Sequence, residues 1–299
     1  MRQIFPLVCL SVCLATVSAM AQNTSNSSFS KAKEMLLKNI YTDYFQTVYC
    51  GATYDPKTKK ITAYPDNFNL TVLPDRAERI EYEHIVPTEN FGRFFSEWRE
   101  GSILCRDSLN RKYKGRKCAE KANIIYGLMQ ADMYNLYPAI GSVNGARSNL
   151  TFTQLPENIP SSFGGGPFKI ADRKAEPPES ARGIVGRTTL YFEEAYAPRY
   201  KLSDSQRKLM QEWATKYPVT KWECTRTYRI ELYQASENKI VKDACMRADL
   251  WPTKEEMLAQ QQQMEAERLA QAQKAQQKAK KNTKKKSKKS KKTIKEMVE

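Results

Sequence analysis

Glu81-Tyr82-Glu83-His84-Ile85-Val86-Pro87 contains the only histidine of this 299-residue chain. Ile80, Tyr82 and His84 fall on one face of a predicted β-strand that ends at the proline. Any mechanism that needs an imidazole base near neutral pH must therefore use His84. Glu83 places a carboxylate beside it, in the position of a metal ligand next to a base. Because neighbours on a regular strand point to opposite faces, the motif requires a twist, a bulge or a strand end here.

The two ends of the chain differ in composition from its middle. Residues 1–21 have the pattern of a secretory signal peptide: Arg2, an apolar run from Ile4 to Val17, and the small-residue site Ala19-Met20-Ala21. No later segment reaches about 18 uninterrupted apolar residues, so no transmembrane helix is predicted. We expect a periplasmic or secreted protein with one domain over residues 22–252 and a tail over residues 253–299.

Five cysteines remain after the predicted signal peptide, and this odd number allows at most two disulfides. Cys105 and Cys118 are close enough in sequence to close a short basic loop. Cys224 and Cys245 flank a helix-like segment and can pair with each other or elsewhere, so the connectivity stays open. Cys50 is the fifth. With no CxxC pair and a single histidine, structural zinc is disfavoured.

Positive charge is concentrated at the C-terminus. The chain has a net charge of +16, of which +10 comes from the twelve lysines and two glutamates between Lys274 and Glu299. This favours a polyanionic partner, and the alternative is a solvated, disordered end. The candidate residues for non-specific nucleic-acid binding are Lys280, Lys281, Lys284, Lys285, Lys286, Lys288 and Lys289.

Hydrophobic periodicity predicts helices through most of the domain. In the helix expected over 89–99, Phe91, Phe94, Phe95 and Trp98 should face the core. The stretches 54–74, 102–117, 135–149 and 156–178 are rich in turn formers. The other helices are expected over 30–48, 119–134, 181–195, 203–216, 221–233 and 237–250, and residues 254–281 have helix-forming composition without an apolar face.

Three blocks in order carry a resemblance to a known family. The first is Glu83-His84-Ile85-Val86-Pro87. The second is Asp132-Met133-Tyr134-Asn135-Leu136-Tyr137-Pro138-Ala139-Ile140-Gly141-Ser142-Val143-Asn144-Gly145-Ala146-Arg147-Ser148-Asn149, and the third runs from Trp222-Glu223-Cys224 to Cys245. Together they resemble the endonuclease I family, non-specific periplasmic or secreted nucleases with a ββα-metal active site. The resemblance implies an α+β fold: a mostly helical domain around a small ββα-metal motif, followed by a disordered or helical basic tail.

The resemblance also implies roles for individual residues. His84 matches the general base, Glu83 and Asn144 match ligands of a single divalent ion, and Asn135 matches a residue that braces the site. Mg²⁺ suits such oxygen ligands and keeps several waters, with Mn²⁺ or Ca²⁺ as alternatives. A neutral imidazole should accept a proton from water through one nitrogen while a backbone carbonyl orients the other.

One departure concerns the arginine that holds the scissile phosphate in the family. At the expected spacing this chain has Ile103 instead, together with a longer cysteine-bracketed insertion. A guanidinium matches phosphate oxygens bidentately, so other arginines are candidates for this contact. They are Arg147 and Arg106, ranked weakly ahead of Arg99.

The sequence thus predicts a Mg²⁺-dependent, sequence-non-specific endonuclease that cleaves DNA and leaves 5′-phosphate ends. RNA is left open as a second substrate, and the protein is expected to be a monomer. The alternative hypothesis is a catalytically degenerate secreted protein that binds nucleic acid or another anionic polymer. The basic tail and Ile103 motivate this alternative, which would show steep salt dependence without cleavage.

Overall fold

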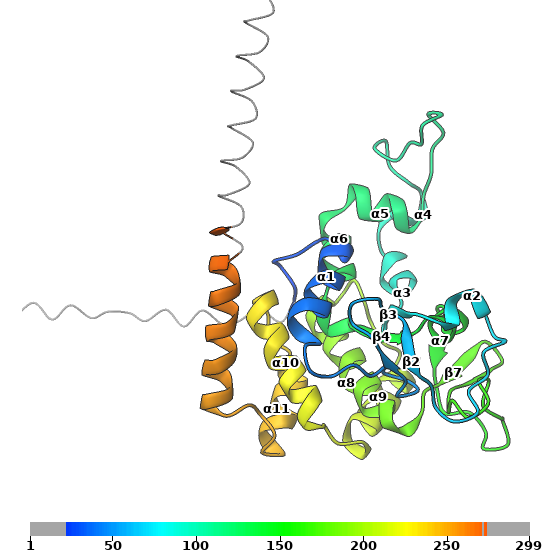
Figure 1. Cartoon of the computed structure of the whole chain (residues 1–299). Helices are drawn as coiled ribbons and strands as arrows, with labels where there is room; N and C mark the ends of the chain where they lie inside the picture. The colour runs from blue at the N-terminus through cyan, green and yellow to red at the C-terminus, as the bar shows by residue number, and fades with distance from the viewer. Residues whose placement is uncertain (1–21, 271, 274–299) are drawn as a thin grey trace, which may run out of the picture.

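The computed structural model describes residues 22–270 and 272–273 (Figure 1). The predicted signal peptide 1–21 and the candidate binding residues Lys280, Lys281, Lys284, Lys285, Lys286, Lys288 and Lys289 lie outside these ranges. Within them, no helix is long and apolar enough to cross a membrane. The fold is α+β and mostly helical, which confirms the predicted class.

A two-stranded antiparallel sheet and one helix form the centre of the domain. β3 (Ile80–His84) pairs with β4 (Leu136–Ile140) from Ile80↔Ile140 to His84↔Leu136, and α7 (Gly141–Arg147) follows β4 directly. The pairing is regular throughout, so β3 ends at His84 without a bulge. This unit has the strand–strand–helix order that the resemblance implied.

The expectation of turns over 135–149 was wrong. Leu136, Ile140 and Val143 are fully buried, and burial of these side chains outweighs the local preference of the intervening glycines and proline. Pro138 lacks an N–H, but it is tolerated because β4 pairs with one strand only among the described residues.

Four C-terminal helices match their predicted positions to within a few residues. α9, α10 and α11 begin at side-chain caps from Ser203, Thr220 and Asn238, which accept hydrogen bonds from exposed backbone N–H groups of the first turn. The four helices are α8 (Glu179–Tyr196), α9 (Asp204–Lys216), α10 (Lys221–Gln234) and α11 (Lys239–Arg247).

The helices before β4 are shorter than predicted. The expected 89–99 helix is split into α3 (Thr88–Gly92) and α4 (Ser96–Arg99), and Phe94 at the break is 50% exposed rather than buried. Trp98 folds back over Gly92, where a Cβ would lie 2.4 Å from the indole ring, and a straight helix does not allow this contact. The predicted 30–48 helix ends early, as α1 (Phe29–Met35) and the π-helical turn η1 (Leu36–Ile40).

The remaining elements are short. β1 and β2 form one antiparallel pair, and β7 lies between β5 and β6, parallel to the first and antiparallel to the second. Their bounds, with those of the helices, are β1 (Thr53–Tyr54), β2 (Ile61–Ala63), α2 (Pro74–Ala77), α5 (Arg116–Ala122), α6 (Ile124–Gln130), the 3₁₀ turn η2 (Met133–Asn135), β5 (Thr151–Phe152), β6 (Lys169–Ala171) and β7 (Lys174–Glu176).

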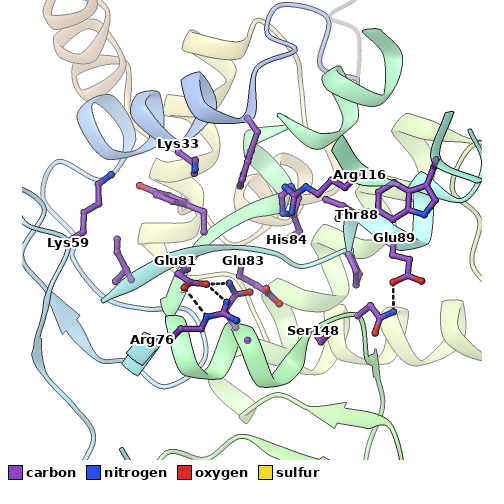
Figure 2. Close-up of a pocket in the computed structure, with 18 residues that line it drawn as sticks. Lys33, Lys59, Arg76, Glu81, Glu83, His84, Thr88, Glu89, Arg116 and Ser148 are labelled. Atoms are coloured by element: carbon purple, nitrogen blue, oxygen red, sulfur yellow. Dashed lines mark hydrogen bonds and ion pairs between the residues drawn. The ribbon is translucent and has the colours of Figure 1, made fainter. Parts of the chain in front are cut away.

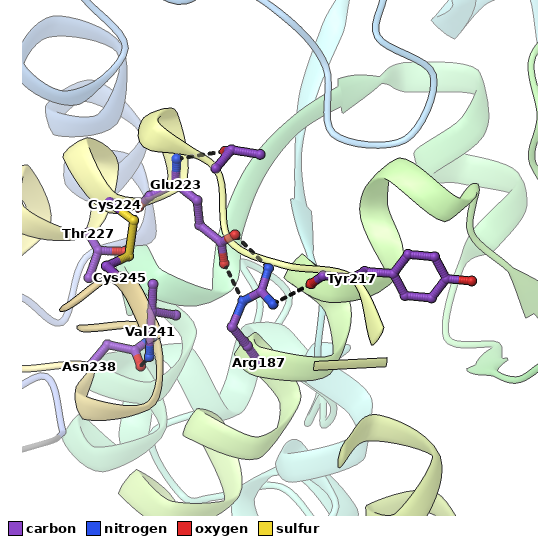
Figure 3. The surroundings of a disulfide bond; sticks show 9 residues. Arg187, Tyr217, Glu223, Cys224, Thr227, Asn238, Val241 and Cys245 are labelled. Carbon is purple, nitrogen blue, oxygen red and sulfur yellow. Dashed lines mark hydrogen bonds and ion pairs between the residues drawn. A yellow bond between two sulfur atoms is a disulfide. The ribbon is translucent and has the colours of Figure 1, made fainter. Parts of the chain in front are cut away.

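Residues 22–270 contain two disulfides, Cys105–Cys118 and Cys224–Cys245, and Cys50 is a free thiol. Cys224–Cys245 joins α10 to α11 beside a buried ion pair between Arg187 and Glu223 (Figure 3). The connectivity that the sequence left open is therefore local: each bonded cysteine pairs with its neighbour in the sequence.

Residues 254–270 form a helix beside α10 (Figure 1). Glu267 accepts hydrogen bonds from Asn39 and Tyr233, and Gln261 donates to the Tyr228 hydroxyl. The first part of the predicted tail is thus attached to the domain through polar contacts.

Candidate active site

A cleft of about 560 Å³ lies beside the β3–β4–α7 unit (Figure 2). His84, Glu81 and Glu83 enter it from β3, and Asn144 enters it from α7. Four cationic side chains also line it: Lys33, Lys59, Arg76 and Arg116. Partial burial, together with the charges of Lys59 and Arg116, lowers the pKa of Lys33. Such crowding of positive charge favours a polyanionic ligand.

His84 is held in one tautomer. Its Nε2 lies 2.9 Å from the backbone carbonyl of Gln130, and because a carbonyl can only accept, Nε2 carries the proton and Nδ1 keeps a lone pair. Phe29 packs against the ring, with the two ring centroids 4.9 Å apart. Burial, and then the charge of Arg116, lower the pKa of His84 to about 3. The imidazole is therefore neutral near pH 7.

Glu83 is buried, but only one of its carboxylate oxygens is engaged. Oε1 accepts hydrogen bonds from the Tyr49 hydroxyl at 2.8 Å and from Arg147 Nη1 at 2.7 Å. Across the described ranges, Oε2 takes part in no hydrogen bond, and the residue lines the cleft. Burial raises the pKa of Glu83, while the Arg147 charge and the Tyr49 hydrogen bond oppose this rise. One oxygen of a held carboxylate thus remains available to a ligand.

Asn144 is oriented by a second carboxylate. Its Nδ2 donates to Glu81 Oε2 at 2.7 Å, and Arg76 binds the same carboxylate through Nε and Nη2. Burial favours the neutral form of Glu81, but the hydrogen bonds from Arg76 and Asn144 bring its pKa below the usual value. In the part of the chain described here, Oδ1 of Asn144 accepts no hydrogen bond.

Asn135 lies under the end of β3. Its Oδ1 accepts from the Val86 N–H at 2.8 Å and its Nδ2 donates to the Val86 carbonyl at 3.0 Å. The side chain is completely buried and does not line the cleft. These two bonds fix the backbone two residues after His84.

None of the three arginines proposed from the sequence lines the cleft. Arg147 is buried, donating to Glu83 and to the carbonyls of His84 and Ile85. Arg99 donates to the carbonyls of Arg93 and Phe94. Arg106 is exposed, outside the cleft, and donates to the Asn110 carbonyl. Ile103 is 83% exposed.

Comparison with known proteins supplies the family. A sequence model of the family described as endonuclease I matches residues 19–245. An extracellular deoxyribonuclease of Aeromonas hydrophila is 35% identical over 244 residues, 79% of this chain and 97% of the relative. A periplasmic deoxyribonuclease of the same species is 34% identical over 80% of this chain and 95% of the relative.

The chain belongs to the endonuclease I family. A further relative, Endonuclease-1 of Buchnera aphidicola subsp. Baizongia pistaciae, is 32% identical over 81% of this chain and 94% of its own length. The match spans all of the residues that enter the cleft.

Endonuclease I proteins are generally metal-dependent, so the oxygen atoms that this cleft offers to a metal ion are of interest. The described residues contain no group of three or more His, Cys, Asp or Glu side chains that could hold a metal ion. They do contain one carboxylate oxygen and one amide oxygen without hydrogen-bond partners, on Glu83 and Asn144. Hard divalent ions that keep several waters accept such a small oxygen set. These two oxygens therefore fit a divalent ion that keeps most of its waters.

The sequence reasoning missed Arg116. This residue lines the cleft, is labelled beside His84 in Figure 2, and donates from Nε to Gln130 Oε1 at 3.1 Å. The same Gln130 supplies the carbonyl that orients His84. The expected spacing from His84 falls on Ile103, before the segment bracketed by Cys105 and Cys118, and so does not reach Arg116. Its residue type does not set Arg116 apart from the other basic residues of 102–117, so the sequence carries no local signal for it.

Proposed function

We propose that this protein is a secreted or periplasmic Mg²⁺-dependent endonuclease that cleaves DNA without sequence preference and leaves 5′-phosphate ends. The observation that carries the proposal is the convergence of three groups in one cationic cleft. They are the neutral imidazole of His84, the unengaged oxygen of Glu83 and the unengaged amide oxygen of Asn144. The family membership and the printed names of the relatives support the same activity.

His84 acts as the general base. Its Nε2–H is held by the Gln130 carbonyl, so Nδ1 is the atom that accepts the proton of the attacking water. Its low pKa keeps Nδ1 unprotonated at neutral pH. Asn135 contributes by fixing Val86, which limits movement of the strand end that carries the base.

Glu83 and Asn144 hold the divalent ion. Arg147 and Tyr49 hold Glu83 from the protein interior, and Glu81 holds the Asn144 amide so that its oxygen is left for the ion. A divalent ion bound there supplies charge stabilisation for the phosphate and the leaving oxygen.

Arg116 binds the scissile phosphate. We assign this contact to Arg116 rather than to Arg147, Arg106 or Arg99, because Arg116 is the one of the four that lines the cleft. A guanidinium presents paired donors to phosphate oxygens, and Lys33 and Lys59 add positive charge on the neighbouring wall. Contacts of this kind bind the backbone without reading bases, so we expect no sequence preference.

Cleavage of supercoiled plasmid by purified residues 22–299 tests the proposal. With Mg²⁺ we expect nicked and linear DNA, and with EDTA none. His84→Ala should cut at least about 100-fold more slowly, the usual effect of removing a general base. Lys208→Ala, on α9, serves as the control and should cut at the wild-type rate.

Binding without cutting, with Mg²⁺ and with Mn²⁺, would instead support the degenerate binding protein. Wild-type activity in His84→Ala would reject the base. A parallel reaction on single-stranded RNA decides whether the substrate class includes RNA.

A further inference from the structure

Residues 102–115 form a projecting hairpin between α4 and α5, called here the finger (Figure 1). Its two arms are joined by hydrogen bonds from Tyr113 N to Cys105 O and from Asp107 N to Arg111 O, each at 3.0 Å. Asn110 makes the turn with a φ of 61°. An ion pair of 2.7 Å joins Asp107 to Arg111, and the Cys105–Cys118 disulfide closes the base. The finger is thus a shaped element rather than a loose loop.

The base of the finger is continuous with the wall of the cleft. The Gly115 N–H donates to the Trp98 carbonyl at 3.0 Å. Trp98 lines the cleft, and so does Arg116, the residue that follows Gly115. Gly115 has a φ of 81°, which an L side chain rarely adopts, so the chain turns sharply between finger and cleft. A polymer lying in the cleft therefore leaves it next to the finger.

The finger surface is cationic. Residues 102–115 contain four basic residues and one acidic residue, Asp107; the basic residues are Arg106, Arg111, Lys112 and Lys114. Lys112 and Lys114 are exposed and, within the described ranges, form no ion pair. Their charges are therefore available to a partner.

The finger also exposes apolar side chains. Ile103 is 83% exposed, Leu109 at the tip is 69% exposed, and Leu104 is 58% exposed. Single exposed apolar residues are ordinary, but three within fourteen residues, next to free lysines, are typical of a contact surface. Sugar edges and base edges in a groove offer apolar contact beside phosphates, which suits this combination.

We propose that the finger is a second DNA-binding element that holds the duplex on one side of the bond being cut. This rests on the proposed function and adds a part of the same substrate's binding surface. From Cys105 to Asp107 the arm is extended and spans about 7 Å, and the chain then turns through Ser108 and Leu109. Because phosphates on one strand are spaced about 3.4 Å apart along the helix axis, the extended part alone covers about two nucleotides from the base of the finger.

The double variant Lys112→Glu/Lys114→Glu tests this. The control is Lys208→Glu/Lys239→Glu, which makes the same charge change on α9 and α11, at the opposite end of the molecule (Figure 1). Binding of a fluorescein-labelled duplex of about 24 base pairs is measured by anisotropy in EDTA over a range of NaCl concentrations. We expect about tenfold weaker binding of the finger variant at about 0.1 M salt. Its salt slope should be about two units shallower, whereas the control should match the wild type.

Two further measurements keep this test separate from the test of the proposed function. Hydrolysis of bis(4-nitrophenyl) phosphate, which is too small to reach the finger, should be unchanged in the Lys112→Glu/Lys114→Glu protein. Leu109→Ala should weaken duplex binding without changing the salt slope. If the wild type never cuts DNA but Lys112→Glu/Lys114→Glu binds the duplex more weakly, the finger proposal is supported and the nuclease proposal is rejected. If the wild type cuts DNA and the finger variant keeps its duplex affinity and salt slope, the proposed role of the finger is wrong and the nuclease proposal stands.

Discussion

Among the described residues, two arginine–carboxylate pairs have both side chains 2% exposed, and they differ in how the two carboxylate oxygens are used. In the helical core, Arg187 binds both oxygens of Glu223, through Nε at 2.8 Å and Nη2 at 2.6 Å, and its Nη1 donates to the carbonyls of Ala214 and Tyr217 (Figure 3). Under the cleft, Arg147 binds Oε1 of Glu83 and leaves Oε2 without a partner from the described residues.

The difference separates a structural pair from a functional one. A buried pair costs desolvation energy, which is better offset when both carboxylate oxygens meet donors, as those of Glu223 do. Glu83 is equally buried, but both of its hydrogen bonds go to one oxygen, and the other oxygen meets no donor from the described residues. Such a deficit is expected where an external cation completes the site.

The largest effect should follow from removing the ligand oxygens. Glu83→Gln keeps an acceptor for Tyr49 and Arg147 but loses the charge, and we expect DNA cleavage to fall about 1,000-fold, equivalent to ~4 kcal/mol of lost charge stabilisation. Asn144→Ala removes the other oxygen without touching the buried pair and should show a similar loss. Initial rates on plasmid DNA measure both, with circular dichroism to establish folding. Near wild-type rates in both would contradict the account.

The structural pair should respond in stability instead. In Glu223→Gln, Arg187 becomes a buried charge without a full partner, and we expect the free energy of unfolding to fall by about 3 kcal/mol. Urea denaturation measures this. Cleavage per folded molecule should stay at the wild-type value, and a large drop in that value would show that the two pairs are not separable in this way.

A smaller effect is expected at Glu81, which positions Asn144. Glu81→Ala should reduce cleavage about tenfold, as is usual for partners of metal ligands, and should raise the Mg²⁺ concentration needed for half-maximal rate. Glu81→Gln retains an acceptor for the amide and should recover part of the loss. Equal rates in Glu81→Ala and the wild type would remove the positioning role.

The smallest expected effect is that of mild acid on His84. Because its pKa is lowered to about 3 in the folded protein, the imidazole signals should not shift between about pH 8 and pH 5. The unfolded chain takes up a proton near its ordinary pKa of about 6.5, so this group's contribution to stability is complete above that pH and declines as the pH falls toward 3. Since His84 is the only histidine, ¹⁵N NMR of the untagged, metal-free protein gives one imidazole and also reports the tautomer. A titration midpoint near 6.5 would contradict the burial of the base.

The sequence predicted the long helices and the blocks around His84 and Asn144, because hydrophobic periodicity and the family motifs are local signals. It did not predict the break at Phe94, which depends on Trp98 packing over Gly92, or the strand Leu136–Ile140, whose turn-like composition is overruled by burial. Nor did it place Arg116 in the cleft or Arg147 in the interior. Which arginine faces the solvent follows from contacts between segments far apart in the chain.

The most direct test of the central claim is metal binding by the isolated protein, without DNA. Titration with Mn²⁺ followed by electron paramagnetic resonance counts bound ions in the wild type, Glu83→Gln, Asn144→Ala and Glu223→Gln. We predict one site in the wild type, binding at least about tenfold weaker in Glu83→Gln and Asn144→Ala, and wild-type binding in Glu223→Gln. Wild-type affinity in Glu83→Gln and Asn144→Ala would show that the open oxygens of this cleft do not hold the ion.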